Sequence, residues 1–292
     1  MARIAFIGLG AMGAPMAANL VAEGCEVAGF DRAVSACETA SALGVPIGAS
    51  MEETTAGAGA VITMLQSGEQ LLSVWRALLP VAHRGSIFID CSTVDMESAV
   101  YAHELARQAG IRSVDAPVSG GVAGARAGTL TFMCGADEEA FATAKPILEK
   151  MGARVIRCGG PGLGQAAKIC NNLMLGVTMI ATAEAFALGE KIGLSARALF
   201  DVASVSSGQS WSLTSYCPVP DLVPSSPAND AYRAGFMTRL MLKDLRLAEN
   251  AGASVGAVTP LCAAAAQLYA LFEAEGGGAS DFSGVIQMLR RK

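Results

Sequence analysis

Histidine and closely spaced cysteines, the usual ligands of transition metals, are scarce in this sequence. Only two histidines occur in 292 residues, His83 and His103, and neither lies beside another soft ligand. The eight cysteines are far apart, and no two of them form a C-x-x-C pair. Such spacing favours neither a zinc site nor a disulfide framework. We therefore expect no bound metal, and thiols that stay reduced in a cytoplasmic protein.

Charge is also sparse, at 16% of residues, and positive charge is the rarer sign. The 21 Lys and Arg residues are outnumbered by 26 Asp and Glu residues, for a net charge of −5, and they form no extended basic cluster. Nucleic-acid binding needs clustered basic side chains that neutralise phosphates, so we expect no nucleic-acid partner. A small-molecule function is the better expectation.

Two apolar segments resemble export or membrane signals only superficially. Residues 4–20 contain three glycines with the spacing of a ligand-binding turn, and residues 252–272 contain Ser254, Pro260 and Gln267. Thr259 and Pro260 have the N-cap and N1 pattern that begins a soluble helix. We expect no membrane segment.

The first half of the chain alternates short β-rich runs with helical stretches. The predicted strands are residues 3–7, 26–31, 60–65, 86–90, 112–115, 130–134 and 154–157. Alternation of this kind is typical of βαβ units on a largely parallel sheet. With 52% hydrophobic residues the chain can bury a large core, and we predict an α/β Rossmann-type domain over residues 1–162.

Strand signals disappear after Gly164. Residues 165–192 contain no proline and are rich in Ala, Leu and Met, which predicts one helix of about 28 residues and roughly 40 Å. Further helical stretches follow around residues 195–204, 236–251 and 260–275. We predict an all-α second domain over residues 163–292, joined to the first by the long interdomain helix.

The segment FIGLGAMGAPM carries glycines in a G-x-G-x-x-G pattern between a predicted strand and a predicted helix. The first glycine permits the tight turn, the second lets the backbone approach a pyrophosphate, and the third lets the helix pack on the strand. The helix N-terminus then faces the phosphates. The predicted dinucleotide loop comprises Gly8, Leu9, Gly10, Ala11, Met12 and Gly13.

Asp31 ends the second predicted strand, where an acidic residue of this fold binds the adenosine ribose hydroxyls. Its carboxylate would repel a 2′-phosphate, so the sequence favours NAD over NADP as the cofactor. The neighbouring Arg32 leaves NADP open, since an arginine at this turn could accommodate that phosphate or stack on adenine.

A second glycine-rich stretch, GPGLGQAAKICNN, leads to Lys168 and Asn172. These two residues are four apart on the predicted long helix and share one face. A helical lysine is usually solvated, but nearly all neighbours of Lys168 are apolar or small, which predicts a desolvated amine suited to proton exchange near neutral pH. The glycines let the chain turn closely from the last strand into the helix.

The stretch DAPVSGGVAGARAGTLTF supplies a third candidate. Ser119, Gly120 and Gly121 can present a hydroxyl and successive backbone N–H groups to an anion such as a carboxylate. On its residues alone, the stretch fits a flexible loop equally well.

Together these motifs resemble the β-hydroxyacid dehydrogenase family over essentially the whole chain. GLGAMGAPMAANL, DAPVSGGVAGARAGTLTF, GQAAKICNN and LMLKDLRLA follow in the order of that family's motifs. The segments SSGQSWSLTSYCPVP and PSSPANDAYRAGF are much more specific than the glycine fingerprint. They resemble the branch of the family that uses NAD to oxidise (S)-3-hydroxyisobutyrate to methylmalonate semialdehyde, a step of valine breakdown.

The resemblance implies a role for each matching position. Lys168 becomes the general acid/base that removes the hydroxyl proton while hydride leaves for the nicotinamide, and residues 119–121 hold the substrate carboxylate. The other implied substrate contacts are Asn172, Trp211 and Phe236. The implied cofactor contacts beyond the glycine loop and Asp31 and Arg32 are Leu65, Gln66, Thr93 and Lys243, with Lys243 reaching back from the helical domain. For Trp211 and Phe236, ordinary core packing is an equal alternative.

Sister enzymes acting on tartronate semialdehyde, 4-hydroxybutyrate or a related short hydroxy acid would use the same lysine. They would also use the same carboxylate-binding residues 119–121, which we call the clamp. Val122 and the apolar second-domain segment favour a methyl-bearing substrate over a more hydroxylated one. A non-catalytic nucleotide-binding protein would be expected to have lost the lysine. The apolar stretch VGAVTPLCAAAAQLYALF and the resemblance both predict helical surface buried between subunits of a homodimer or homotetramer.

Overall fold

The computed structural model describes residues 3–290, and the chain divides into two compact units, the first ending at Lys168 and the second beginning at Ile169. The domain boundary expected from the sequence, between residues 162 and 163, falls where helix α8 (Leu163–Lys191) begins. The first residues of α8, including Lys168, therefore belong to unit 1. The predicted long helix is confirmed, and it begins two residues earlier than expected.

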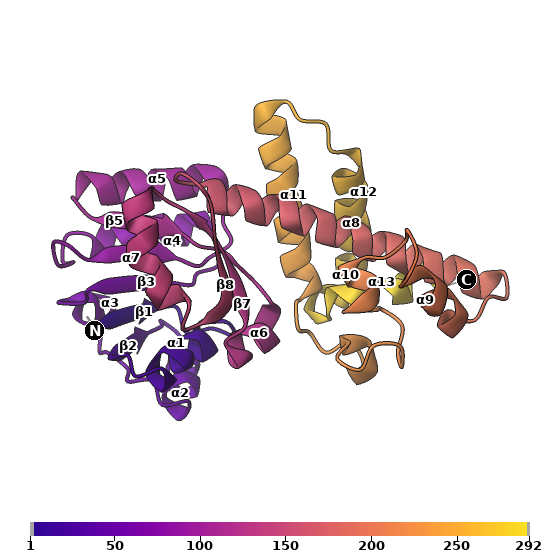
Figure 1. Ribbon diagram of the computed structural model, residues 1–292, viewed down its shortest axis with the longest axis horizontal. Helices are drawn as coiled ribbons and strands as arrows, with labels where there is room; N and C mark the ends of the chain where they lie inside the picture. Colours follow the sequence, from indigo (N-terminus) through magenta and orange to yellow (C-terminus); the bar gives the residue numbers. More distant parts are fainter. Residues whose placement is uncertain (1–2, 291–292) are drawn as a thin grey trace. The chain divides into compact units, whose positions relative to one another are not determined.

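Unit 1 is built on an eight-stranded sheet with the order β2-β1-β3-β4-β5-β7-β6, in which β8 pairs with β7 (Figure 1). Strands β1 to β5 pair in parallel, whereas β7 is antiparallel to β5 and β6 and parallel to β8. The strands are β1 (Ile4–Ile7), β2 (Val27–Phe30), β3 (Ala60–Thr63), β4 (Ile87–Asp90), β5 (Arg112–Asp115), β6 (Val118–Ser119), β7 (Leu130–Gly135) and β8 (Gly152–Gly159). The predicted mostly parallel sheet is confirmed, and only the two-residue β6 was not predicted.

Helices bury both faces of this sheet. Ile4 and Phe6 of β1 join one core cluster with α1 (Gly13–Ala22) and α7 (Glu138–Leu148), whereas Ala5 and Ile7 join a second cluster with α4 (Gly68–Leu78) and α5 (Met96–Gln108). The segments of β1 and β3, IAFI and AVIT, therefore consist almost entirely of apolar residues, as is typical of parallel sheets covered on both sides. The remaining helices of unit 1 are α2 (Val34–Ala42), α3 (Met51–Thr55) and α6 (Gly121–Ala127).

Unit 2 is helical, and its described part, residues 169–290, contains no named strand. Its helices after α8 are α9 (Ala196–Ala203), α10 (Trp211–Thr214), η1 (Pro227–Asp230), α11 (Thr238–Val255), α12 (Pro260–Ala274), η2 (Gly277–Ala279), η3 (Phe282–Gly284) and α13 (Val285–Leu289). Helices α11 and α12 run side by side (Figure 1). A Cβ atom at Gly176 of α8 would lie 2.9 Å from Leu245 of α11, so these two helices approach closely. The predicted all-α second domain is confirmed.

Within residues 3–290, α8 is the one helix whose length and composition would suffice to cross a membrane. In its most apolar window 44% of the residues are buried inside the protein. Core helices of soluble proteins show the same combination, so this helix is weak evidence for a membrane span.

Candidate active site

The glycine loop follows β1. In the sheet β1 lies between β2 and β3, so the chain extends the sheet in opposite directions on the two sides of β1. Gly8 has φ +98°, and a Cβ atom there would collide with the Met64 carbonyl, while one at Gly13 would collide with the carbonyl of Gly8. Gly10 is exposed, and a Cβ atom at this position would meet no atom of the described part of the chain within 4 Å. The first and third glycines thus permit close packing, and the second leaves open backbone for a pyrophosphate. These residues fit a dinucleotide.

The Asp31 carboxylate holds the glycine loop in place. Its Oδ2 accepts a hydrogen bond from the Leu9 N–H at 2.7 Å, and its Oδ1 accepts one from the Ala33 N–H at 2.8 Å. The Leu9 side chain is buried in the core, whereas Ala11 is exposed and Met12 is partly buried. Arg32, the next residue in sequence, is exposed. The structure therefore places all of these predicted cofactor residues at the ends of β1 and β2.

The predicted cofactor contacts Leu65 and Thr93 lie on the loops that follow β3 and β4. The Ser92 hydroxyl joins the two loops, since it accepts the Leu65 N–H at 2.7 Å and donates to Oδ1 of Asp90 at 2.6 Å. The Thr63 hydroxyl donates to the same carboxylate oxygen at 2.7 Å. Burial raises the pKa of Asp90 to about 6, although the hydrogen bonds from Ser92 and Thr63 favour the charged form. Gln66, after Leu65, is exposed.

Lys168 is buried, with 8% of its surface exposed, as the sequence predicted. Its Nζ donates a hydrogen bond to the carbonyl of Val118 at 2.7 Å, and Val118 directly precedes Ser119 in β6. The structure thus brings the predicted catalytic lysine to the predicted carboxylate clamp. A neutral lysine amine can keep an N–H···O bond to this carbonyl while its lone pair accepts a proton.

The clamp itself is a tight turn. Gly120 has φ +131° and Gly121 has φ +61°, and Gly121 begins α6. The first N–H groups of a helix have no partner within the helix. Ser119 and Gly121 are partly buried and Gly120 is exposed. Residues 119–121 therefore form the turn that leads from β6 into α6.

Two buried residues that hold the start of α8 were not singled out from the sequence, Asp115 at the end of β5 and Gln165 in the first turn of α8. The Asp115 carboxylate accepts the N–H groups of Gly162 at 2.8 Å and Gln165 at 2.9 Å, and it lies 2.9 Å from Nε2 of His103. The Gln165 side chain donates to the Ser92 carbonyl at 2.8 Å and accepts the Val94 N–H at 3.2 Å. The only available signal was that both residues lie inside the quoted motifs, DAPVSGG and GQAAK.

In unit 2, Asn172 and Lys243 share one buried partner that the sequence analysis also missed. The Asn172 amide, 1% exposed, donates to Oδ2 of Asp244 at 2.5 Å, and the Lys243 Nζ lies 3.3 Å from the other oxygen. Asp244 is 3% exposed and lies in the quoted motif LMLKDLRLA. This carboxylate therefore orients both predicted site residues.

Trp211 and Phe236 belong to one aromatic group in unit 2. Trp211 stacks on Tyr216 with 4.9 Å between ring centroids, and both Tyr216 and Phe236 pack on Phe282. The buried Asp281 carboxylate fixes the group, since it accepts the Tyr216 hydroxyl at 2.9 Å and the Phe236 N–H at 3.0 Å. Trp211 is 52% exposed, which does not fit ordinary core packing.

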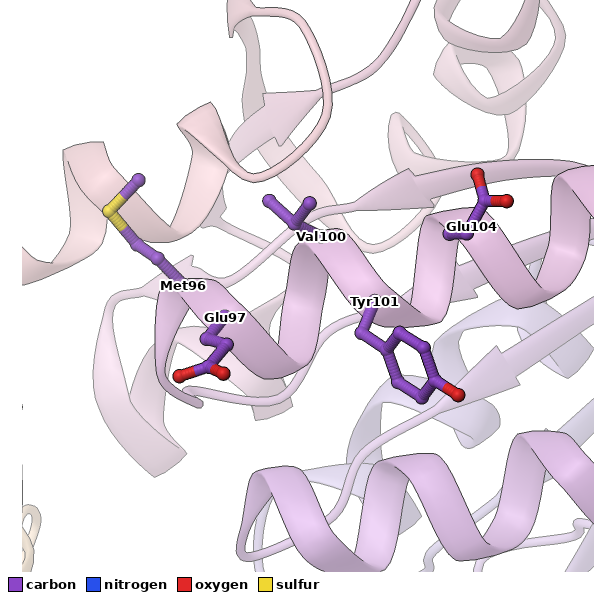
Figure 2. A pocket seen from close by; sticks show the side chains of 5 residues that line it. All are labelled: Met96, Glu97, Val100, Tyr101 and Glu104. Atoms are coloured by element: carbon purple, nitrogen blue, oxygen red, sulfur yellow. The ribbon is translucent and has the colours of Figure 1, made fainter.

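A surface hollow lies apart from these residues, on the outer side of α5 (Figure 2). It is lined by Met96, Glu97, Val100, Tyr101 and Glu104. Its two charged side chains are carboxylates, which repel an organic acid or a phosphate, so we do not include it in the candidate site. Among residues 3–290, no group of three or more His, Cys, Asp or Glu side chains converges as a metal site.

Two family models together match nearly the whole chain. Residues 3–160 match the NAD binding domain of 6-phosphogluconate dehydrogenase. Residues 162–289 match the model described as NAD-binding of NADP-dependent 3-hydroxyisobutyrate dehydrogenase. The matches show dinucleotide-binding domains without deciding between NAD and NADP.

Individual relatives cover the chain from end to end. It is 50% identical over 292 residues to a probable 3-hydroxyisobutyrate dehydrogenase of Mycobacterium tuberculosis, with 100% of this chain and 99% of the relative covered. It is 44% identical to an NAD-dependent L-serine dehydrogenase of Pseudomonas aeruginosa, with 99% and 98% covered. A solved structure described as M. tuberculosis 3-hydroxyisobutyrate dehydrogenase with L-serine matches it with a TM-score of 0.95 at 50% identity, covering 100% of both chains.

Proposed function

Since this chain belongs to the 3-hydroxyisobutyrate dehydrogenase family of NAD-binding β-hydroxyacid dehydrogenases, we propose that it oxidises (S)-3-hydroxyisobutyrate to methylmalonate semialdehyde with NAD, in valine breakdown. The observation that carries the proposal is the buried Lys168, whose Nζ lies 2.7 Å from the carbonyl of Val118, next to the clamp at residues 119–121. A short acid held by its carboxylate at this clamp has its hydroxyl within reach of the lysine.

In the proposed reaction each group of the chain has a separate task. When bound, NAD supplies the hydride acceptor, the nicotinamide ring. The clamp binds the substrate carboxylate, and Lys168 accepts the hydroxyl proton as the carbonyl forms. The hydrogen bond to Val118 fixes the amine while its lone pair faces the substrate. For Asn172, Trp211, Phe236 and Lys243, we propose the substrate and cofactor contacts that the family resemblance implies.

We propose NAD as the preferred cofactor on the strength of Asp31. Its carboxylate lies against the glycine loop, where the adenosine ribose of a dinucleotide binds in this fold. A negative charge at this point opposes a 2′-phosphate. Arg32, the exposed residue that follows Asp31, favours NADP instead.

L-Serine is a second candidate substrate, because one relative is named an L-serine dehydrogenase and a solved relative is described with L-serine. L-Serine shares the carboxylate and the primary hydroxyl of 3-hydroxyisobutyrate but carries an ammonium where the latter carries a methyl group. Val122, partly buried in α6 directly after the clamp, favours the methyl group. Tartronate semialdehyde, glycerate and 4-hydroxybutyrate are weaker candidates for the same clamp.

The test follows NADH or NADPH absorbance with (S)-3-hydroxyisobutyrate, L-serine, glycerate and 4-hydroxybutyrate. We expect the highest kcat/KM for (S)-3-hydroxyisobutyrate with NAD, and a fall in kcat of about 10²- to 10⁴-fold for Lys168→Ala. Lys145→Ala, at an exposed lysine of α7, is the matched control. A higher kcat/KM for another acid would replace our substrate, and full activity of Lys168→Ala would remove the lysine from the mechanism.

A further inference from the structure

Gln165 is a fully buried amide that joins α8 to the loop after β4. Its side chain is 0% exposed, and its two hydrogen bonds, to the Ser92 carbonyl and from the Val94 N–H, lie on either side of Thr93. Lys168 follows three residues later on the same helix, about 4.5 Å along its axis. The Gln165 amide therefore ties the loop that carries Thr93, a predicted cofactor contact, to the helical turn before Lys168, the predicted proton acceptor.

The same loop is joined to the other cofactor loop. Ser92, whose carbonyl accepts the Gln165 amide, uses its hydroxyl to accept the Leu65 N–H at 2.7 Å. The backbone of Gln165 is held separately, since its N–H donates to Asp115 of β5 at 2.9 Å. Asp115 thus fixes the start of the helix. The Gln165 side chain separately joins the helix to the loop after β4, and through Ser92 to the loop after β3.

We propose that Gln165 is a positioning residue, which fixes Lys168 relative to the cofactor loops that carry Thr93 and Leu65. The inference rests on the proposed function for the roles of Lys168 and the loops. A side chain that lacks either a donor or an acceptor cannot both donate to the Ser92 carbonyl and accept the Val94 N–H, so the loop loses its hydrogen bonds to α8. The reacting groups are then present but misplaced, which reduces the rate of the chemical step more than it weakens substrate binding.

The first test compares Gln165→Leu with wild type, with Gln108→Leu at the exposed end of α5 as the control. For Gln165→Leu we expect kcat to fall at least about 10-fold, toward the 10²-fold cost of a ~1 Å misplacement, with a smaller change in the KM for substrate. The deuterium isotope effect on kcat, with substrate deuterated at the hydroxyl-bearing carbon, should rise. The Val94 amide should lose protection from hydrogen exchange.

The second test uses Gln165→Glu, because a protonated carboxyl can make both of the native hydrogen bonds and a carboxylate cannot donate. The titratable groups around this position are Asp115, its partner His103, Asp90 and Lys168. We expect the activity of Gln165→Glu relative to wild type to rise as the pH is lowered, while the ratio for Gln165→Leu stays flat. This variant also decides the question if Gln165→Leu does not fold.

Unchanged kcat and isotope effect in Gln165→Leu, or equal pH dependence of the two variants, would overturn the inference. If wild type oxidises none of the four acids, the proposed function fails, and the inference is then judged on Val94 exchange and on NAD affinity, which need no substrate. Unchanged Val94 exchange and NAD affinity would then overturn it.

Discussion

Asp90 is a buried carboxyl group whose ionisation is unfavourable in the folded protein. It is 1% exposed, its Oδ2 has no hydrogen-bond partner among residues 3–290, and burial raises its pKa from 3.8 to about 6. The folded state therefore binds this proton more tightly than the unfolded chain does. The resulting stabilisation is fully present below pH 4 and is lost as the pH rises through 6.

Asp90→Asn should remove this part of the pH dependence, because the amide resembles the protonated carboxyl and does not titrate. From pH 4 to pH 7, the free energy of unfolding of Asp90→Asn should rise relative to that of wild type by about 2–3 kcal/mol. Urea unfolding at several pH values measures the difference. Parallel pH profiles of the two proteins would show that Asp90 keeps an ordinary pKa in the folded protein.

Asp31 allows the cofactor preference to be tested at one residue. Asp31→Asn removes the negative charge but keeps an oxygen that can accept the Leu9 N–H. We expect the kcat/KM ratio of NADP to NAD to rise by about tenfold or more, equivalent to ~1.4 kcal/mol, with Arg32 then free to approach a 2′-phosphate. The double variant with Arg32→Ala should lose this gain. An unchanged ratio would place the selectivity elsewhere.

At the scale of elements, α8 begins at a cap that comes from a distant strand. Asp115 of β5 accepts the N–H groups of Gly162 and Gln165, a role that a Ser, Thr or Asp directly before the helix usually performs. Such a cap fixes the first turn of α8 to the sheet as well as satisfying its donors. The position of Lys168 therefore depends on a contact across about fifty residues of sequence.

Asp115→Ala should consequently lower the free energy of unfolding by more than the loss of an ordinary helix cap does. It leaves two N–H groups and His103 without their buried partner, and we expect the free energy of unfolding to fall by about 2–5 kcal/mol. Asp137→Ala is the matched control, because Asp137 caps α7 locally through the Ala140 N–H and should cost about 1 kcal/mol. Equal losses in urea unfolding would mean that the long-range cap has no additional effect.

Periodicity and composition were enough to predict the helices and strands. They were not enough to predict the hydrogen-bond partners of the site residues. All seven predicted strands and the long helix are present, whereas β6 was missed because two residues between a proline and two glycines give no periodic signal. The burial of Lys168 follows from its apolar neighbours in sequence. Its bond to Val118, and that of Asn172 to Asp244, join residues 50 and 72 positions apart and depend on tertiary packing that no local pattern encodes.

At the scale of the whole molecule, exposed apolar side chains are denser in the described part of unit 2 than in that of unit 1. Around the turn between α11 and α12, Val255 is 78% exposed, Val258 89% and Leu261 66%. Large contiguous apolar surface on a soluble protein usually marks an interface. We propose that a second copy of this chain covers surface of unit 2, in a homodimer or homotetramer.

The mass of the wild-type protein in solution, from light scattering at working concentration, should be two or four times that of the chain. Val258→Asp combined with Leu261→Asp should shift the mass toward the monomer, because burying a carboxylate in an apolar interface without a partner is strongly unfavourable. On a free monomer the same exposed substitutions should change stability by only about 0.5 kcal/mol each. Val34→Asp, at a 72% exposed position of unit 1, should leave the assembly intact. A monomeric wild type would overturn the proposal, and an unchanged mass of the double variant would move the interface away from this turn.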